Sequence, residues 1–274
     1  MSLCFLIVLY KKKPSDSETF KSLQNCKNLL KGNCITYLWD NSPTPLSSNE
    51  IKDITTDNPE LAINYIANKS NTYLSVIYNK IIRLCSRDGF LVILDHDSSF
   101  ESSYIETIIK ETDNPQNIDI NLFLPLIMSH NRIFSPSTEY FRLISKLWNT
   151  PKLGRVPVNK MQAINSGMVI RTNYLKDEFP GYDEHLRFYV TDLDFMYKYR
   201  SQNKDVFILD ARIDHTLNFY EENNDSKAQR FKEQRRGILL ISEKQNVFLY
   251  YLQFLRLVYV TIRFCLKYRT LQFV

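Results

Sequence analysis

One segment constrains the fold of this chain more than any other, the run FLVILDHDSS at residues 90–99. Five apolar residues end abruptly in Asp95, His96 and Asp97. An apolar run of this length with polar residues on both sides is typical of a strand buried in a parallel sheet. Such sheets bind ligands at their carboxyl edge, so the two carboxylates emerge where a divalent cation and a phosphate could be held. An ordinary polar turn after a strand is the alternative interpretation.

Apolar runs before this segment extend the same pattern. Residues 3–10 and 34–39 are apolar almost throughout, and each predicts a buried strand. Residues 15–30 lie between them and carry apolar side chains at helical spacing, with Ser15 or Asp16 as the expected N-cap. A strand, a helix and a strand in this order predict parallel pairing through a right-handed crossover. The predicted fold class is therefore α/β, with a mostly parallel mixed sheet flanked by helices.

Apolar spacing and turn residues also predict the elements in the rest of the chain. In chain order these are a loop over 43–60, a strand or turn over 61–67, helices over 73–87 and 103–112, a strand over 118–128, a helix over 138–148, a loop over 149–162, a strand over 168–171, a turn of helix over 173–178, a helix from 191 to about 202, and a short strand over 206–209. The alternation of strands and helices fits a nucleotide-binding α/β domain.

Net charge and cysteine usage narrow the class of function. The chain of 274 residues has a formal net charge of +5 and a pI of about 8.8, which suits an anionic ligand or an anionic membrane surface. Its bases form no dense stripe before the C-terminal region, so a nucleic-acid partner is not expected. Five cysteines without a C-x-x-C pair are typical of reduced core thiols in a cytoplasmic protein, and zinc is not expected.

The N-terminal segment predicts a strand and not a targeting signal. Its apolar core, residues 3–9, has no basic segment before it and no small-residue cleavage site after it. No stretch of 18 uncharged apolar residues occurs in the sequence, so a transmembrane helix is not expected.

Four further residues stand where predicted strands end or helices begin. Asp40 ends a strand, either as an ordinary turn residue or as a carboxylate that binds a nucleotide. Gly167, in an N-S-G segment, permits a ligand to approach the backbone closely. Asp192 opens a helix, either as a cap residue or as a carboxylate aimed into a cleft. His215 follows a further short strand.

The C-terminal region differs in composition from the rest of the chain. Residues 221–236 are highly charged and contain the densest basic patch, with Arg230, Arg235 and Arg236. Residues 237–274 are largely apolar, with a narrow set of polar residues at roughly helical intervals: Gln253, Arg256, Arg263 and Lys267. This pattern fits either a helix that packs on the core with one wet edge, or a helix in the plane of a membrane with its bases on lipid headgroups.

The order of these motifs resembles the common core of the GT-A glycosyltransferases, specifically the inverting enzymes of family 2. A strand ending in D-x-D, a small-residue loop, an acidic segment that carries the catalytic base, and a late histidine follow one another in that family. They are matched here by Asp95-His96-Asp97, Asn165-Ser166-Gly167, Val190-Thr191-Asp192 and His215. The family's first strand, its V-D-N-x-S segment and its F-D-E segment are matched by 3–10, Trp39-Asp40-Asn41-Ser42 and Tyr182-Asp183-Glu184. The resemblance covers residues 3 to about 220.

The resemblance implies a role for each matched residue. Asp97, with His215 and with help from Asp95, would bind Mn²⁺ or Mg²⁺ and thereby the diphosphate of a nucleotide sugar. Asp40, Asp95 and Gly167 would contact the nucleotide. Asp192 would be the catalytic base, although Thr191 stands where the family has an acidic residue, which leaves Asp194 as the alternative base.

The resemblance also implies an acceptor and a location. The style of the motifs is similar to that of bacterial rhamnosyl- and hexosyltransferases of surface-polysaccharide assembly, such as O-antigen, capsule or exopolysaccharide. The acceptor would be a glycan or a polyprenyl-diphosphate-linked sugar, with Arg230, Arg235, Arg236 and Trp148 as acceptor-binding candidates. The enzyme would be cytoplasmic and peripheral at the inner face of the membrane, which it would contact through residues 238–274.

The predicted domain organisation follows from these assignments. Residues 1–220 form the catalytic domain, with a nucleotide-binding half over 1–100 and an acceptor half over 101–220, and residues 221–274 form a basic, amphipathic helical extension. Two other functions stay open. One is an inactive nucleotide-sugar-binding protein. The other is an α/β nucleotidyltransferase, which usually has a glycine- and base-rich loop after its first strand, whereas residues 10–14 here have bases but no glycine.

Overall fold

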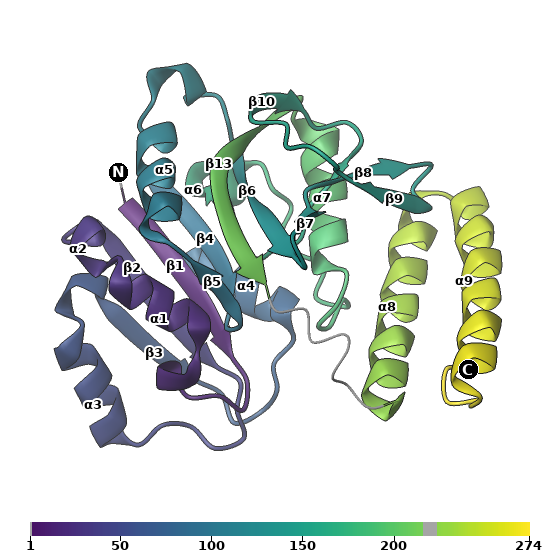
Figure 1. Cartoon of the computed structure of the whole chain (residues 1–274), viewed down its shortest axis with the longest axis horizontal. Helices are drawn as coiled ribbons and strands as arrows, with labels where there is room; N and C mark the ends of the chain where they lie inside the picture. Colours follow the sequence, from purple (N-terminus) through teal and green to yellow (C-terminus); the bar gives the residue numbers. More distant parts are fainter. Residues whose placement is uncertain (1, 216–223) are drawn as a thin grey trace.

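A mixed ten-stranded sheet forms the centre of the protein in the computed structural model, which describes residues 2–215 and 224–274 (Figure 1). Its strand order is β10-β13-β6-β12-β4-β1-β2-β3, with β5 paired to β13 and β7 paired to β6, and a three-stranded sheet has the order β11-β8-β9. The strands are β1 (Ser2–Leu9), β2 (Cys34–Asp40), β3 (Ile63–Ala67), β4 (Gly89–Asp95), β5 (Ser98–Phe100), β6 (Leu122–Ser129), β7 (Arg132–Ser135), β8 (Ser137–Tyr140), β9 (Ile144–Leu147), β10 (Gly154–Pro157), β11 (Met161–Gln162), β12 (Met168–Arg171) and β13 (Asp205–His215).

Helices lie on both faces of the large sheet (Figure 1). They are α1 (Glu18–Asn25), α2 (Lys27–Leu30), α3 (Ser48–Asp57), α4 (Leu74–Leu84), α5 (Ser102–Thr112), α6 (Thr172–Asp177), α7 (Thr191–Gln202), α8 (Asn224–Gln245) and α9 (Val247–Tyr268), with short 3₁₀ turns at Pro14–Asp16, Pro59–Leu61 and Pro115–Asn117. The mostly parallel sheet flanked by helices confirms the predicted fold class.

Burial on both faces explains the uninterrupted apolar runs. Successive side chains of a strand point to opposite faces, so a strand that is covered on both sides needs apolar residues throughout. In β1, Cys4, Leu6 and Val8 pack with α4, α6 and α7 on one face, whereas the alternate residues of β1 pack with α1 and α5 on the other. Strand β1 pairs in parallel with both β2 and β4, which confirms the predicted crossover order.

Register places the candidate carboxylates at one edge of the sheet. Val8 of β1 is opposite Asp95 of β4, and Leu9 of β1 is opposite Asp40 of β2. The two acids therefore stand on either side of the same strand end, at the carboxyl edge that was predicted to bind ligands.

Several predicted elements were wrong or misplaced. The supposed loop over 43–60 contains α3, which begins with a capping box in which Ser47 and Glu50 bond each other's backbone N–H groups. The supposed helix over 138–148 is the hairpin of β8 and β9, and the supposed loop over 149–162 contains β10 and β11. Ser17, and not Ser15 or Asp16, caps α1.

The strand ends also differ from those expected. Strand β6 begins only at Leu122, and β13 extends to His215, well beyond the short strand predicted over 206–209. Exposed polar residues alternate with buried residues in the second half of β13. The apolar stretch from which the strand was predicted therefore covers only part of it. The predicted domain boundary at residue 220 lies outside the residues that the structure describes.

Helices α8 and α9 lie side by side beyond the large sheet (Figure 1). Helix α8 meets the segment before α7 at Gly237, where an added Cβ would come within 2.3 Å of a Val190 methyl group, so only glycine permits this approach. Arg187 and Glu233 form an ion pair of 3.0 Å beside this contact. The segment that leads into α7 is therefore held by α8.

Helix α9 is long and apolar enough, by length and composition alone, to cross a membrane, and most of that window is not buried. The requirement for 18 uncharged residues did not detect it because Arg256, Arg263 and Lys267 interrupt the helix. Only Gln253, Leu257 and Thr261 of α9 are buried. The helix thus packs on its neighbour along one side and exposes the rest.

Candidate active site

Asp95, Asp97 and His215 come together at the end of β4. One ligand atom from each of the three side chains lies within 4.8 Å of the others, and His215 Nδ1 is 3.6 Å from Asp97 Oδ1. Antiparallel pairing of β5 with β13 brings this about, because it sets His215 opposite Ser98, the residue after Asp97. The structure therefore assembles the three residues that were predicted to hold a metal.

The D-H-D turn is held by hydrogen bonds from distant segments. Thr19 Oγ1 donates to the backbone carbonyl of Asp95 and accepts from the Ser98 N–H, and Ser17 Oγ donates to the His96 carbonyl over 2.8 Å. The His96 ring Nδ1 lies 3.2 Å from the Val8 carbonyl, so this residue ties the turn to β1 as well as spacing the two acids. Sequence reasoning missed Ser17 and Thr19, whose only signal was their place at the start of a helix.

The electrostatics of this cluster favour a cation. Burial raises the pKa of Asp95, and the negative charge of Asp97 raises it further. A divalent cation between the two carboxylates would remove that repulsion. Two carboxylates with one imidazole form a donor set compatible with Mn²⁺, whereas Mg²⁺ prefers oxygen donors alone. The residues thus fit the divalent metal that was predicted here, with Mn²⁺ as the better match.

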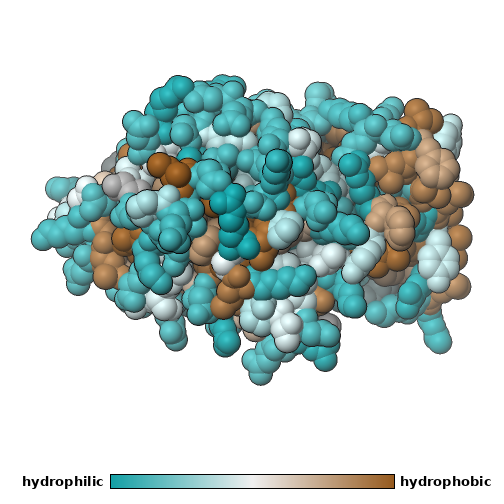
Figure 2. All heavy atoms as spheres, turned by 90° about the horizontal axis from the view of Figure 1, so that it is seen from above, coloured by the Kyte–Doolittle hydropathy of each residue, from teal (hydrophilic) through white to brown (hydrophobic). Residues whose placement is uncertain are grey.

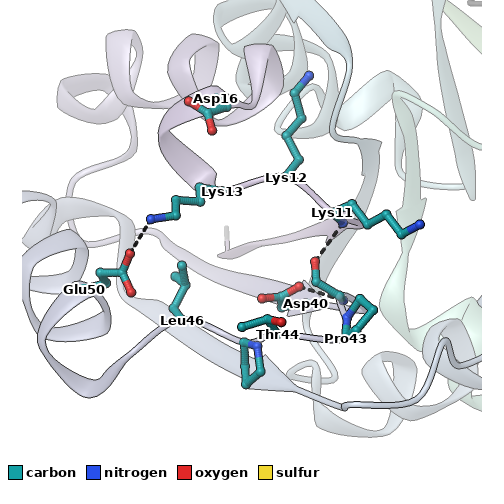
Figure 3. A pocket seen from close by; sticks show the side chains of 11 residues that line it. Lys11, Lys12, Lys13, Asp16, Asp40, Pro43, Thr44, Leu46 and Glu50 are labelled. Carbon is teal, nitrogen blue, oxygen red and sulfur yellow. Dashed lines mark hydrogen bonds and ion pairs between the residues drawn. The ribbon is translucent and has the colours of Figure 1, made fainter.

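Asp40 borders a hollow of about 490 Å³ on the other side of β1 (Figure 3). Its Oδ1 accepts from the Ser42 N–H over 2.9 Å, and its Oδ2 accepts from the Tyr65 hydroxyl over 2.5 Å. The hollow is lined mainly by the loop after β1 and the segment after β2: Lys11, Lys12, Lys13, Asp16, Asp40, Ser42, Pro43, Thr44, Pro45, Leu46 and Glu50. Its lysines and its place beside the metal cluster suit an anionic nucleotide.

Tyr65, on β3, was not predicted as a site residue. Burial and the hydrogen bond to Asp40 raise the pKa of its phenol to about 12, so it stays a donor, and it also accepts from the Leu46 N–H over 2.9 Å. Tyr65 therefore connects the Asp40 carboxylate to the loop that closes the hollow.

Replacing Tyr65 with phenylalanine is expected to weaken nucleotide binding and lower stability. The change leaves Asp40 Oδ2 and the Leu46 N–H each without this partner, which typically costs about 1–3 kcal/mol. Calorimetric titration with UDP and GDP should show about tenfold weaker binding of whichever nucleotide the wild type binds. Tyr259→Phe, which removes an exposed hydroxyl on α9, is the matched control and should change neither quantity. Unaltered affinity and melting temperature in Tyr65→Phe would contradict the assigned role.

Gly167 has a left-handed conformation with φ of +81°, and an added Cβ would come within 2.6 Å of Ile213 and 2.7 Å of Pro125. Core packing therefore requires glycine here. The predicted contact of Gly167 with a nucleotide stays a prediction. Its neighbours connect the segment after the D-H-D turn to the start of α7, because Ser166 Oγ lies 2.9 Å from Ser98 Oγ and Asn165 Nδ2 donates to Thr191 Oγ1 over 2.9 Å.

Asp192 and Asp194 have different surroundings at the start of α7. Asp194 is buried, pairs with Lys198 at 2.6 Å, and accepts from the Asp183 N–H. Asp192 accepts from the Leu193 N–H over 2.9 Å and has no ion pair with any residue that the structure describes. Burial raises the pKa of Asp192 to about 6, and the charge of Asp95 acts in the same direction. Of the two acids, Asp192 is the one available as a base.

The Asp192 carboxylate also borders a second hollow, of about 260 Å³. The other described residues that line it are Phe134, Ser135, Ser137, Ser145, Leu147, Gln162, Ala163, Ile164 and Leu193. Ser137, Ser145, Leu147 and Gln162 belong to the three-stranded sheet, and the last three of them lie in segments that were predicted as helix and loop. An acceptor in this hollow would lie against Asp192.

The predicted acceptor-binding residues do not line this hollow. Trp148 is buried and donates its indole N–H to Thr138 Oγ1 over 2.9 Å, although its neighbour Leu147 does reach the hollow. Arg230 lies over the Tyr189 ring at 5.9 Å, Arg235 donates to Thr261 Oγ1 over 3.5 Å, and Arg236 is exposed. Acceptor binding by these residues stays a prediction.

Solved structures of glycosyltransferases resemble this fold. S. aureus TarS 1–349 in complex with UDP-GlcNAc superposes with a TM-score of 0.54 and 13% identity over 88% of this chain and 66% of that one. GalNAc-T7 with UDP, GalNAc and Mn²⁺ superposes with a TM-score of 0.58 and 11% identity over 85% of this chain and 48% of that one. The mannosyltransferase PcManGT from Pyrobaculum calidifontis, with GDP-Man and Mn²⁺, superposes with a TM-score of 0.59 and 9% identity over 89% of this chain and 64% of that one.

These structures are GT-A-type glycosyltransferases, so the chain has the GT-A fold that the motif order implied. The chain spans about two thirds or less of the length of each. No family model matches the chain, and no curated protein matches it.

Proposed function

We propose that this chain transfers a sugar from a nucleotide-diphosphate sugar to an acceptor hydroxyl, with inversion at the anomeric carbon. One observation carries the proposal: Asp192 borders a hollow of its own, and the start of its helix is linked to the D-H-D turn by hydrogen bonds from Asn165 to Thr191 over 2.9 Å and from the Asp95 N–H to Ser166 Oγ over 3.3 Å. A diphosphate held at the cluster would then lie near a base that faces an acceptor. This is the arrangement that a single in-line displacement requires.

Each polar group has a task in this reaction. The hollow at Asp40 and the lysine loop binds the nucleoside, and Asp95, Asp97 and His215 would hold a divalent cation beside the diphosphate. When bound, the cation supplies positive charge to the leaving diphosphate. Asp192 takes the proton from the acceptor hydroxyl, which becomes the nucleophile. The pKa of about 6 suits a base that is ionised at neutral pH and still basic enough to accept a proton.

The acceptor that we propose is a glycan or a polyprenyl-diphosphate-linked sugar of bacterial surface-polysaccharide assembly. The enzyme would work at the inner face of the cell membrane, as a catalytic domain over 1–220 with a helical extension over 221–274. The net charge of +5 and the exposed apolar side of α9 support a membrane-associated acceptor.

Incubation with a panel of nucleotide sugars and Mn²⁺ tests the reaction class. Slow release of a nucleoside diphosphate from one donor is the expected result, because water can replace the acceptor at Asp192. Release of pyrophosphate would instead indicate a nucleotidyltransferase. Binding of a nucleotide sugar with no release, even after addition of candidate acceptors, would indicate an inactive binding protein. Asp192→Asn serves as the control, because it should bind the same donor without releasing the diphosphate.

A further inference from the structure

The turn of the β8–β9 hairpin exposes apolar side chains that have no structural use in the described part of the chain. Phe141 is 87% exposed and Ile144 is 63% exposed, and Tyr140 beside them is also open to solvent. Cross-strand register sets Tyr140 opposite Ile144 on one face of the hairpin, while Glu139 on the other face is buried against Arg200 of α7. The hairpin therefore has an inner polar side, fixed to α7, and an outer apolar side.

Helix α9 carries a second exposed apolar surface. Spaced at 100° per residue, its side chains fall into three sectors. One sector packs towards α8 through Gln253, Leu257 and Thr261. A second sector carries only bases among its exposed residues, Arg256, Arg263 and Lys267. The third is apolar and exposed, and its members are Val247, Phe248, Tyr251, Phe254, Leu255, Val258, Tyr259, Ile262 and Leu266.

Arg142, at the tip of the hairpin, joins the hairpin to α9 and to the end of α8. Gln253 of α9 donates to the Arg142 carbonyl over 2.5 Å, and the Arg142 guanidinium donates to Gln245 at the end of α8. The same guanidinium stacks over the Tyr197 ring of α7 at 5.0 Å. Figure 2 shows hydrophobic side chains gathered at the end of the molecule where α9 lies. The hairpin tip is thus hydrogen-bonded to the packed side of α9.

Charge on this surface is of one sign. The sequence has no acidic residue over 140–176 or over 246–274. Bases flank the apolar residues in both segments: Arg142, Lys146 and Lys152 near the hairpin, and Arg256, Arg263, Lys267 and Arg269 in and after α9. An apolar face with basic edges matches the boundary between the acyl chains and the headgroups of an anionic bilayer.

We propose that the outer side of the β8–β9 hairpin and the apolar sector of α9 form one docking surface that seats the protein on an anionic lipid bilayer. Helix α9 lies in the plane of the bilayer and does not cross it, because one of its sectors packs on α8 and another is basic. The hairpin is the second point of attachment, and it fixes how the domain is turned towards the lipid.

This orientation bears on the acceptor, and that step rests on the proposed function. Leu147, on β9, is partly exposed and lines the hollow that contains Asp192. Strand β9 thus contributes Ile144 to the docking surface and Leu147 to the hollow, so docking through the hairpin brings the hollow close to the bilayer. An acceptor whose reacting sugar is attached to a lipid through a diphosphate could then reach Asp192 without leaving the membrane.

Flotation with vesicles tests the docking surface. The purified full chain should float with vesicles of phosphatidylethanolamine and phosphatidylglycerol, float less in high salt, and float poorly with phosphatidylcholine alone. The double variant Phe141→Ser with Ile144→Ser should partition about 10- to 100-fold less, because two exposed apolar side chains no longer enter the lipid. Phe248→Ser with Leu255→Ser on α9 should have a similar effect. Ile118→Ser, which is 75% exposed in the connection before β6, is the matched control and should float like the wild type.

Other outcomes would overturn the proposal. Unchanged flotation of the hairpin variant, with a melting temperature equal to that of the wild type, would show that the hairpin is not part of the docking surface. Resistance of bound protein to extraction by alkaline carbonate would show that α9 crosses the bilayer. A stable dimer in light scattering that the serine variants disrupt, without any flotation, would show that a second copy covers the face. Donor hydrolysis by the wild type without vesicles reports on the proposed function separately, so either idea can fail while the other stands.

Discussion

The variant Asp192→Asn is expected to lose about 10²–10⁴-fold in transfer rate and yet to be more stable than the wild type. The loss follows from the removal of the proposed base, which borders the hollow of about 260 Å³. The gain follows from the raised pKa of about 6, compared with the ordinary 3.8, because this shift means that the fold disfavours the ionised form of Asp192. Two pKa units correspond to about 3 kcal/mol, so the neutral amide should raise the melting temperature by several degrees at pH 7.5.

The direction of the change in stability follows from how the contribution of Asp192 depends on pH. A group whose pKa is raised on folding contributes stability that is fully present below its unfolded value of 3.8 and is lost as the pH rises through about 6. The asparagine variant does not titrate there, so the difference in melting temperature should be small near pH 4 and reach its maximum above pH 7. The transfer rate of the wild type should decrease as the pH drops below about 6, because Asp192 is then protonated and cannot accept a proton.

Asp194→Asn is the matched control for this experiment. Asp194 lies two residues along the same helix, is buried, and pairs with Lys198, so its amide variant leaves a charge without its partner. It should melt at a lower temperature than the wild type at pH 7.5. If Asp192→Asn retained nearly normal turnover while Asp194→Asn lost it, the base would be Asp194.

The sequence could predict the buried strands and the acidic residues at their ends. Buried strands require apolar residues on both faces, so the runs over 3–10 and 90–94 were recognisable, and parallel pairing then placed Asp40 and Asp95 at one edge. The approach of His215 to Asp97 depends on antiparallel pairing between β5 and β13, which are more than 100 residues apart. Only the order of motifs in a known family suggested it.

The sequence could not predict contacts that cross the fold. Residues 138–148 have aromatic and apolar side chains at spacings that also suit a helix, and they form a hairpin because Glu139 is satisfied by Arg200 and Tyr197 of α7. Asp40 owes its hydrogen bonds partly to Tyr65 on the neighbouring strand. Helix α3 did have a local signal, the S-x-x-E capping box at Ser47, but its surroundings are so polar that they were taken for a loop.

Removing the proposed metal, or the proposed ligand Asp97, is the second change with a large expected effect. Treatment with EDTA should reduce donor hydrolysis to about one hundredth or less, because the charge that develops on the leaving diphosphate would no longer be neutralised, and Mn²⁺ should restore it. In Asp97→Asn, the Mn²⁺ concentration for half-maximal activity should rise at least about tenfold, since a neutral amide oxygen replaces a carboxylate. His215→Gln should show a smaller increase.

Thermal melting separates metal binding from catalysis in this variant. A ligand at 100 times its dissociation constant stabilises the folded state by about 2.7 kcal/mol, so Mn²⁺ should raise the melting temperature of the wild type by several degrees. Asp97→Asn should show about half of this increase or less at the same Mn²⁺ concentration. Without metal it should melt no lower than the wild type, because the change relieves the repulsion that raises the pKa of Asp95. Asp214→Asn removes an exposed acid beside His215 that is not part of the cluster, and it should respond to Mn²⁺ like the wild type. If Mn²⁺ raised the melting temperature of Asp97→Asn as much as that of the wild type, the metal would not bind at Asp97, and the proposed diphosphate site would be wrong as well.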